Sequence, residues 1–164
     1  MRPVLALLAL ALPAVLGCTP PDCARPDHGS CGGSCCALSW SLDSTPEDVF
    51  KQLYNMTHDG GPDGRFRFVA EDIVEDLPYL LKATHATASA QYIDEIRIGV
   101  NQGPSGSGSL VTAFSLSTTV NAYGDAGQNY KNLALVASTL QGVVQETTLY
   151  GCPIAADTMR MAAK

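Results

Sequence analysis

Residues 91–120 read QYIDEIRIGVNQGPSGSGSLVTAFSLSTTV, and this stretch decides the fold of the chain. In its first part Ile96 and Ile98 share one face, while charged residues take the other. Residues 101–109 are rich in Gly and Ser, and residues 110–120 alternate again. Alternation with period two is typical of half-buried strands, and a Gly-rich connection between two such runs is typical of a hairpin. The stretch therefore predicts an antiparallel sheet.

Further strands and two helices are predicted on both sides of this hairpin. Strands are expected at residues 36–43, 65–70 and 79–88, and helices from Pro46 to Met56 and over residues 128–140. Residues 71–78 have no clear pattern and are interpreted as one helical turn before Pro78. Each helix carries one apolar stripe, which must be buried against another element. The fold class is therefore α+β: an antiparallel β-sheet of about five strands, two helices packed on one face, and a disulfide-stapled N-terminal loop.

The chain of 164 residues is expected to contain one folded domain with additions at both ends. The predicted parts are a signal peptide (1–17), a Cys-rich loop (18–36), the α+β domain (37–142) and a C-terminal tail tied by Cys152 (143–164). The β-branched residues of 143–150 suggest an extended segment that leads to Cys152.

The first 17 residues indicate export from the cytosol. Arg2 precedes an apolar run over residues 4–16, which is typical of a secretory signal and too short to span a bilayer. The predicted location is secreted or extracytoplasmic. Val-Leu-Gly-Cys at 15–18 also resembles a bacterial lipobox, so a lipid anchor at Cys18 is the alternative. The sequon that begins at Asn55 predicts N-glycosylation and fits a eukaryotic secretory route.

The six cysteines predict disulfides rather than a metal site. They are Cys18, Cys23, Cys31, Cys35, Cys36 and Cys152. An even number favours complete pairing in an exported chain. Adjacent Cys35 and Cys36 are not expected to bond to each other, because the ring would distort the peptide bond and their side chains point to opposite faces of a strand. We expect Cys152 to pair with one of the N-terminal cysteines.

Charge and composition exclude some classes of partner. The net charge is −6 and the isoelectric point is about 4.8, with no run of Lys or Arg. Such a chain lacks the basic patch that nucleic-acid binding requires, and it is poorly suited to anionic membrane surfaces. No transmembrane segment, metal site or cofactor motif is predicted.

The candidate binding residues lie around the start of the last helix and on the strands beside it. Asp125 can cap that helix, and Gly127 allows a tight approach of the backbone. In the functional interpretation, Asp125, Asn129 and the free N–H groups of the helix start surround a small polar or anionic ligand. His85 and Asp94, each on a strand, complete the candidate set.

A family resemblance rests on three short motifs. They are Tyr-Ile-Asp-Glu-Ile at 92–96, Phe-Ser-Leu-Ser at 114–117 and Gly-Asp-Ala-Gly-Gln-Asn at 124–129. Together they resemble the domain of unknown function 1499 family, found in bacteria and plastid-bearing organisms, over roughly residues 38–140. The family carries an acidic strand, an R-S-x-S-R strand and D-x-G-x-N at the last helix, which Asp94, Asp125, Gly127 and Asn129 match. The family's arginines have no counterpart here, so a ligand bound by them is not implied for this chain.

Two classes of function follow. The first is a non-catalytic binding or accessory module for an unknown small ligand or partner protein, and we favour it because no nucleophile–base pair is apparent. The alternative is a hydrolase-like enzyme that uses His85, Asp94 and Asp125. The distribution of the resembling family adds a third possibility, a structural accessory subunit, for example in the thylakoid lumen.

Overall fold

The structure is a computed structural model that describes residues 35–74, 77–119 and 125–152. Its elements in chain order are β1 (Cys35–Leu42), α1 (Pro46–His58), β2 (Phe66–Val74), β3 (Leu77–Ala86), β4 (Ile93–Gln102), β5 (Ser109–Ser117), α2 (Gln128–Ala137) and β6 (Val143–Tyr150). The predicted signal peptide, Cys18, Cys23, Cys31 and the end of the tail lie outside the described residues.

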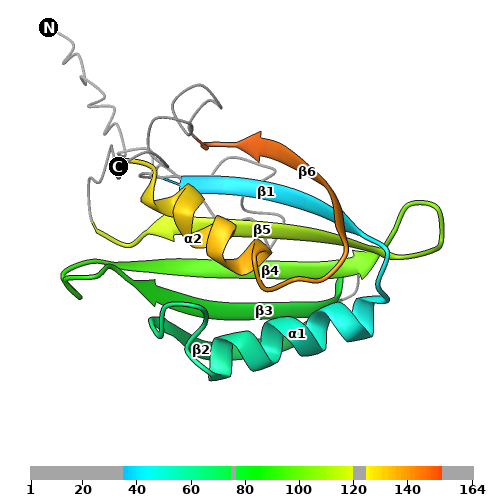
Figure 1. Cartoon of the computed structure of the whole chain (residues 1–164), viewed down its shortest axis with the longest axis horizontal. Coiled ribbons are helices and arrows are strands. Elements are labelled where there is room, and N and C mark those ends of the chain that lie inside the picture. The colour runs from blue at the N-terminus through cyan, green and yellow to red at the C-terminus, as the bar shows by residue number, and fades with distance from the viewer. Residues whose placement is uncertain (1–34, 75–76, 120–124, 153–164) are drawn as a thin grey trace, which may run out of the picture.

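The strands form one antiparallel sheet with both helices on the same face (Figure 1). The strand order is β2-β3-β4-β5-β1-β6. This confirms the predicted α+β class, although the sheet has six strands rather than about five. The sixth is β6, which was expected to be an extended tail beyond residue 142. It joins the sheet because β1 would otherwise be an edge strand, and β6 pairs with its backbone groups.

The helical turn expected over residues 71–78 is wrong. Residues 71–74 continue β2, and β3 begins at Leu77. Register shifts within the β2–β3 pair interrupt the regular alternation. A run with such bulges does not show a clean period of two, which explains why the sequence pattern was unclear there.

The core lies between the sheet and the helices. On β1, the alternating residues predicted to face inward are buried: Cys36, Leu38, Trp40 and Leu42. On α1, Thr45 caps the helix by accepting a hydrogen bond from the Asp48 backbone N–H (3.2 Å). Val49 and Leu53 of α1 pack into the same core as Leu133 of α2.

One strand presents its smaller residues to the core. On β5, Val111 and Ala113 belong to the core under the helices, whereas Phe114 packs in a separate cluster with Cys35 and Ala37. The large residues at 110, 112, 114 and 116 therefore lie on the face away from the helices. Small side chains on the inner face of β5 let α2 approach the sheet closely.

A disulfide joins the first and last strands of the domain. Cys36 is bonded to Cys152, 116 residues away, which confirms the predicted pairing of Cys152 with an N-terminal cysteine. Cys35 is also disulfide-bonded, and it belongs to the cluster on the opposite face of the sheet. The two adjacent cysteines therefore do not bond to each other, as expected.

Strand β6 is otherwise exposed. Residues 143–149 are all exposed, including Val144 (65%) and Leu149 (40%). Glu146 is the main side-chain anchor of the strand, because its carboxylate accepts hydrogen bonds from the Trp40 indole N–H (2.8 Å) and from the Tyr130 hydroxyl. The disulfide and this carboxylate supplement the backbone pairing with β1.

Removing the disulfide should destabilise the domain strongly. In the chain-entropy model a bond that closes a loop of this length contributes about 5 kcal/mol to the free energy of unfolding. We expect the double variant Cys36→Ala/Cys152→Ala to lose about this amount in urea denaturation. The control is Ser39→Ala/Thr147→Ala, a non-covalent pair across the same two strands, which should change stability little. Equal losses in the two variants would contradict the predicted role of the disulfide.

Candidate functional site

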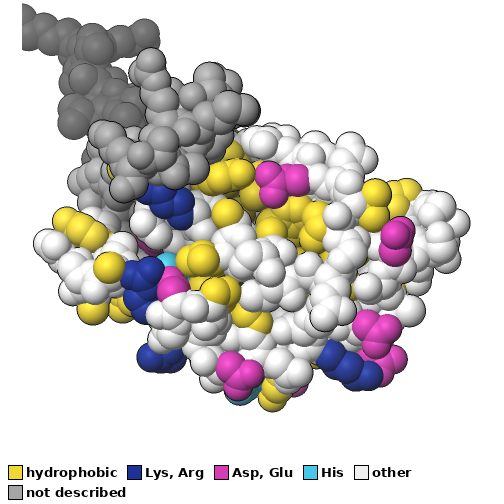
Figure 2. Space-filling model, in the orientation of Figure 1, with side chains coloured by type: hydrophobic (Ala, Val, Ile, Leu, Met, Phe, Trp, Pro, Cys, Tyr) yellow, Lys and Arg dark blue, Asp and Glu magenta, His cyan; other side chains and the backbone are white. Residues whose placement is uncertain are grey.

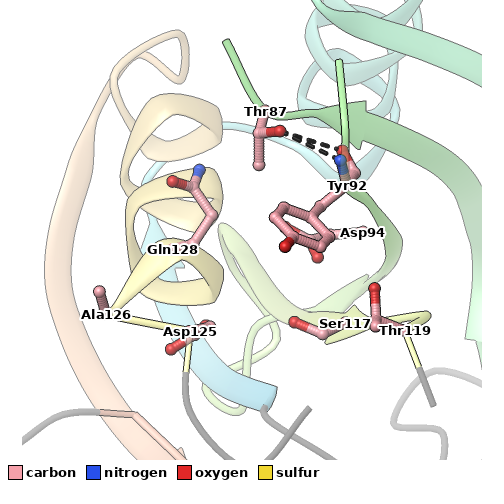
Figure 3. A pocket seen from close by; sticks show the side chains of 8 residues that line it. All are labelled: Thr87, Tyr92, Asp94, Ser117, Thr119, Asp125, Ala126 and Gln128. Carbon is pink, nitrogen blue, oxygen red and sulfur yellow. Dashed lines mark hydrogen bonds between the residues drawn. The ribbon is translucent and has the colours of Figure 1, made fainter. Parts of the chain in front are cut away.

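A pocket of about 410 Å³ lies at one end of the sheet, where the β3–β4 hairpin, the end of β5 and the start of α2 meet (Figure 3). The described residues that line it are Thr87, Tyr92, Asp94, Ser117, Thr119, Asp125, Ala126 and Gln128. Its volume is at the small end of the range for ligand pockets, about 300–1,000 Å³.

The floor of the pocket is built by cross-strand neighbours. His85, Asp94 and Ser117 are directly opposite one another on β3, β4 and β5, so their side chains lie in one row on the face that carries the helices. Next to this row the hairpin is closed by Thr87, whose hydroxyl accepts a hydrogen bond from the Tyr92 backbone N–H (3.2 Å). Regular strand pairing therefore fixes the floor.

The wall formed by α2 depends on Asp125. Its carboxylate accepts hydrogen bonds from the backbone N–H groups of Gly127 (2.9 Å) and Asn129 (2.7 Å). Gly127 precedes the helix in a left-handed conformation (φ 75°), which glycine adopts readily. The predicted cap is therefore present. Because Asp125 itself supplies the negative charge at these N–H groups, the geometry does not favour the anionic ligand considered from the sequence.

Behind the pocket lies a continuous set of hydrogen bonds, here called the α2 polar network. Its members are Asp94, Ser115, Ser117, Asp125, Asn129 and Asn132. The Asn132 amide donates to Asp94 (2.7 Å) and to Ser115 (3.1 Å). Ser115 donates to the Asn129 carbonyl oxygen (2.6 Å), and the Asn129 amide donates to Ser117 (3.0 Å) and Asp125 (2.7 Å). The network thus links the two carboxylates of the pocket.

The network uses up its own donors. An Asn side chain has two N–H donors, and both are engaged within the network on Asn129 and on Asn132. Gln128 donates to the Asn132 carbonyl oxygen (2.7 Å), so that oxygen is also engaged. What the network can still offer a ligand is mainly lone pairs on oxygen, on the carboxylates and on the Gln128 side-chain carbonyl.

Asp94 is almost fully buried, with 3% of its surface exposed. Burial is the largest effect on its pKa and raises it, and repulsion from Asp125 raises it further. Hydrogen bonds from Asn132 and Ser117 and the nearby His85 ring act in the opposite direction, but they do not outweigh burial. The pKa of Asp94 therefore lies above its ordinary value, and loss of its proton is costly unless a positive group approaches.

The contacts of the His85 side chain are with Phe66 and Asp63 rather than with the pocket. Its ring packs against Phe66, with centroids 4.4 Å apart, and its Nε2 lies 2.9 Å from an Asp63 carboxylate oxygen. Burial would raise the pKa of Asp63, but hydrogen bonds from Arg65 and His85 hold it below the ordinary value. Asp63 is thus an acceptor, and we assign the proton to Nε2 of His85. Within the described residues, Nδ1 of His85 is a buried side-chain atom without a hydrogen-bond partner.

The structure brings the predicted site residues together only in part. Asp94 and Asp125 line one pocket, while Gly127 and Asn129 support its wall. His85 lies in the row of Asp94, but its hydrogen bond goes to Asp63. The contributions that the sequence did not reveal come from Asp63, Thr87, Tyr92, Ser115, Ser117, Thr119, Gln128 and Asn132. The three-residue spacing of Asn129 and Asn132 on one helix face was the available signal.

The described residues that line the pocket are acidic or uncharged. No Lys, Arg or His is among the described residues that line the pocket. On the helix-bearing face, Figure 2 shows Lys and Arg side chains scattered over the described surface rather than gathered in one patch. In the part of the chain that the structure describes, no cluster of three or more His, Cys, Asp or Glu is arranged to hold a metal ion. No helix there is long and apolar enough to cross a membrane.

Comparison of the chain with protein-family models gives no match, and comparison with curated proteins gives no match either. The resemblance to the domain of unknown function 1499 family therefore stays a prediction.

The raised pKa of Asp94 predicts a specific pH dependence. A carboxyl group whose pKa is higher in the folded than in the unfolded state lowers the free energy of unfolding as pH rises from its ordinary value, about 3.9, through the folded value. Asp94→Asn removes this loss, at about 1.4 kcal/mol for each unit of pKa difference. We expect the variant to unfold at a higher urea concentration than wild type at pH 7, and the gain to shrink as pH falls toward 3.

The matched control is Glu95→Gln, which removes the same charge from the neighbouring residue on the opposite face of β4. Its stability should not show this pH-dependent gain. A wild-type protein that is more stable than Asp94→Asn at neutral pH would contradict the interpretation.

Proposed function

We propose that this protein is a non-catalytic binding module that holds a small polar molecule in the pocket between the sheet and α2. The observation that carries the proposal is a pocket lined by carboxylate, hydroxyl and amide groups and backed by the α2 polar network. A pocket with a few fixed polar groups is the usual form of a small-molecule site. Because the supporting side chains are buried and hydrogen-bonded, they need little ordering when a ligand binds.

The arrangement gives less support to a hydrolase. Catalysis by His85, Asp94 and Asp125 would need the imidazole within hydrogen-bond reach of a reacting group. Instead, Nε2 of His85 is bonded to Asp63, and the ring is fully buried against Phe66. Ser117 lines the pocket, but its hydroxyl group accepts from Asn129 and hydrogen-bonds to Asp94, and neither nitrogen of the His85 imidazole is bonded to it. Binding therefore remains the better-supported function.

The proposed setting is outside the cytosol. The disulfide between Cys36 and Cys152 fits an oxidising compartment, as does the apolar leader of residues 1–17. We propose a secreted glycoprotein with an N-linked glycan on Asn55, which is exposed on α1. Lipid anchoring through Cys18 and residence in the thylakoid lumen are the alternatives.

Filling the pocket should abolish binding. Thr119 lines the pocket and is exposed, and no hydrogen bond of the α2 polar network involves it. We expect molecules that give saturation-transfer NMR signals with the wild-type protein to lose them with Thr119→Trp. Ser105→Trp, which places the same bulk at the exposed tip of the β4–β5 hairpin, should keep the signals. If the molecules that bind the wild-type protein bind both variants equally, a ligand site in this pocket would be contradicted.

The mass of the mature protein tests the proposed route. After expression of the full chain in a eukaryotic secretory host, we expect protein in the medium that lacks residues 1–17 and loses mass on treatment with a peptide N-glycosidase. Asn55→Gln should lack that mass loss, and Asn101→Gln, which is outside any sequon, should retain it. Full-length, unglycosylated protein retained in cells would contradict secretion and glycosylation.

A further inference from the structure

We propose that the ligand of this pocket is a small organic cation that carries several N–H donors, of the ammonium, amidinium or guanidinium class. This inference rests on the proposed function and gives its ligand a chemical identity. Two features support it: the hydrogen-bond acceptors that the side chains behind the pocket leave open, and the burial of Asp94 beside a second carboxylate.

The buried side chains behind the pocket leave mostly acceptors open. The amide donors of Asn129 and Asn132 are used inside the α2 polar network, and Ser115 donates there as well. A ligand rich in acceptors would compete with bonds that already exist. A ligand rich in N–H donors would instead use carboxylate lone pairs in the pocket lining, mainly those of Asp94 on β4, because Asp125 at the start of α2 already accepts three hydrogen bonds (Figure 3).

Because Asp94 is buried, a positive group beside it would stabilise its ionised carboxylate. Asp94 is 3% exposed, and the second carboxylate of the pocket, Asp125, repels its carboxylate. Two carboxylates beside a small cavity favour a cation, and the attraction is strongest at Asp94, which is the more buried of the two. Among the described lining residues no Lys, Arg or His supplies that charge, and a cationic ligand would supply it.

His85 lies next to Asp94 on the sheet but is not among the described residues that line the pocket. Its Nε2–H points to Asp63, which leaves the Nδ1 lone pair fully buried and without a partner in the described structure. Such an atom normally has a hydrogen-bond partner, and its absence calls for an explanation. His85 is directly opposite Asp94 in the row that forms the pocket floor. The unpaired nitrogen therefore marks a second buried polar group beside Asp94, out of direct reach of a ligand in the pocket.

A polyatomic cation fits better than a metal ion. Calcium takes about six to eight oxygen ligands, and the described residues hold no cluster of acidic, His or Cys side chains arranged for a metal. The pocket volume of about 410 Å³ also far exceeds the size of a bare ion. Tyr92 contributes an aromatic ring to the lining, and aromatic faces attract organic cations.

The test is calorimetric titration of the mature, disulfide-bonded protein at pH 7 and low salt. The probes are agmatine as the N–H-bearing cation, choline as a cation without N–H donors, myo-inositol as a neutral polyol, succinate as an anion, and calcium chloride. We expect agmatine to bind most tightly. Its affinity should fall at least tenfold in Asp94→Asn and stay within twofold of wild type in Glu95→Gln, which changes the net charge equally.

The stability of Asp94→Asn excludes a trivial loss of binding. This variant is expected to be more stable than wild type at pH 7, so weaker binding by a better-folded protein must come from the site itself. Lowering the pH should also weaken agmatine binding in wild type more than in Asp94→Asn, because protonation of Asp94 removes the charge that attracts the ligand.

Several results would overturn the inference. If myo-inositol or succinate binds more tightly than agmatine and Thr119→Trp abolishes that binding, the ligand class is wrong while the proposed binding function stands. Tightest binding of choline or calcium would exclude the N–H-bearing class. Equal weakening by Asp94→Asn and Glu95→Gln would show only long-range charge attraction. Absence of agmatine binding to a protein whose pocket binds other screened molecules would likewise refute the cation class alone, whereas a screen without any pocket ligand would refute both proposals.

Discussion

The burial of the Asp94 carboxylate is the constraint on which the candidate site depends. A charged group taken out of water must be satisfied by hydrogen bonds or it destabilises the fold. Asn132 supplies one of these bonds from α2, and Ser117 supplies another from β5. The position of α2 over the sheet is therefore fixed at this end by polar contacts, whereas Leu133 and Val136 fix it elsewhere by apolar packing.

This division gives the inner face of the sheet two different regions. Under most of the two helices it is apolar and closely packed. At the end occupied by the pocket, Ser115, Ser117 and Asp94 present polar side chains that hydrogen-bond to α2. A hydrogen-bonded polar layer contributes less to stability than apolar packing of the same volume, but it admits few alternative arrangements. The shape of the pocket is thus specified by hydrogen bonds whose geometry is fixed.

Much of the fold could be predicted from the sequence, because alternation and helix caps are local signals. The candidate site was accessible only where such signals exist: Asp125 stands at a helix start, and Asp94 interrupts an apolar strand face. Asn132 could not be assigned, since a polar residue on a helix is usually solvated and only the polar strands opposite it make burial favourable. The same limit applies to β5, where alternation reveals a strand but not which face meets the helices, and to β6, whose assignment depends on its partner β1.

The bond between Cys36 and Cys152 also changes the topology of the molecule. Because it joins the start of β1 to the residues just after β6, residues 36–152 form a closed covalent ring. A protease that cut the exposed Gly- and Ser-rich tip between β4 and β5 would open this ring without separating the two fragments. New termini could equally be placed at that tip by circular permutation, since β1 and β6 would remain tied to each other. In this domain β1 and β6 therefore stay linked even when the chain is opened at another point.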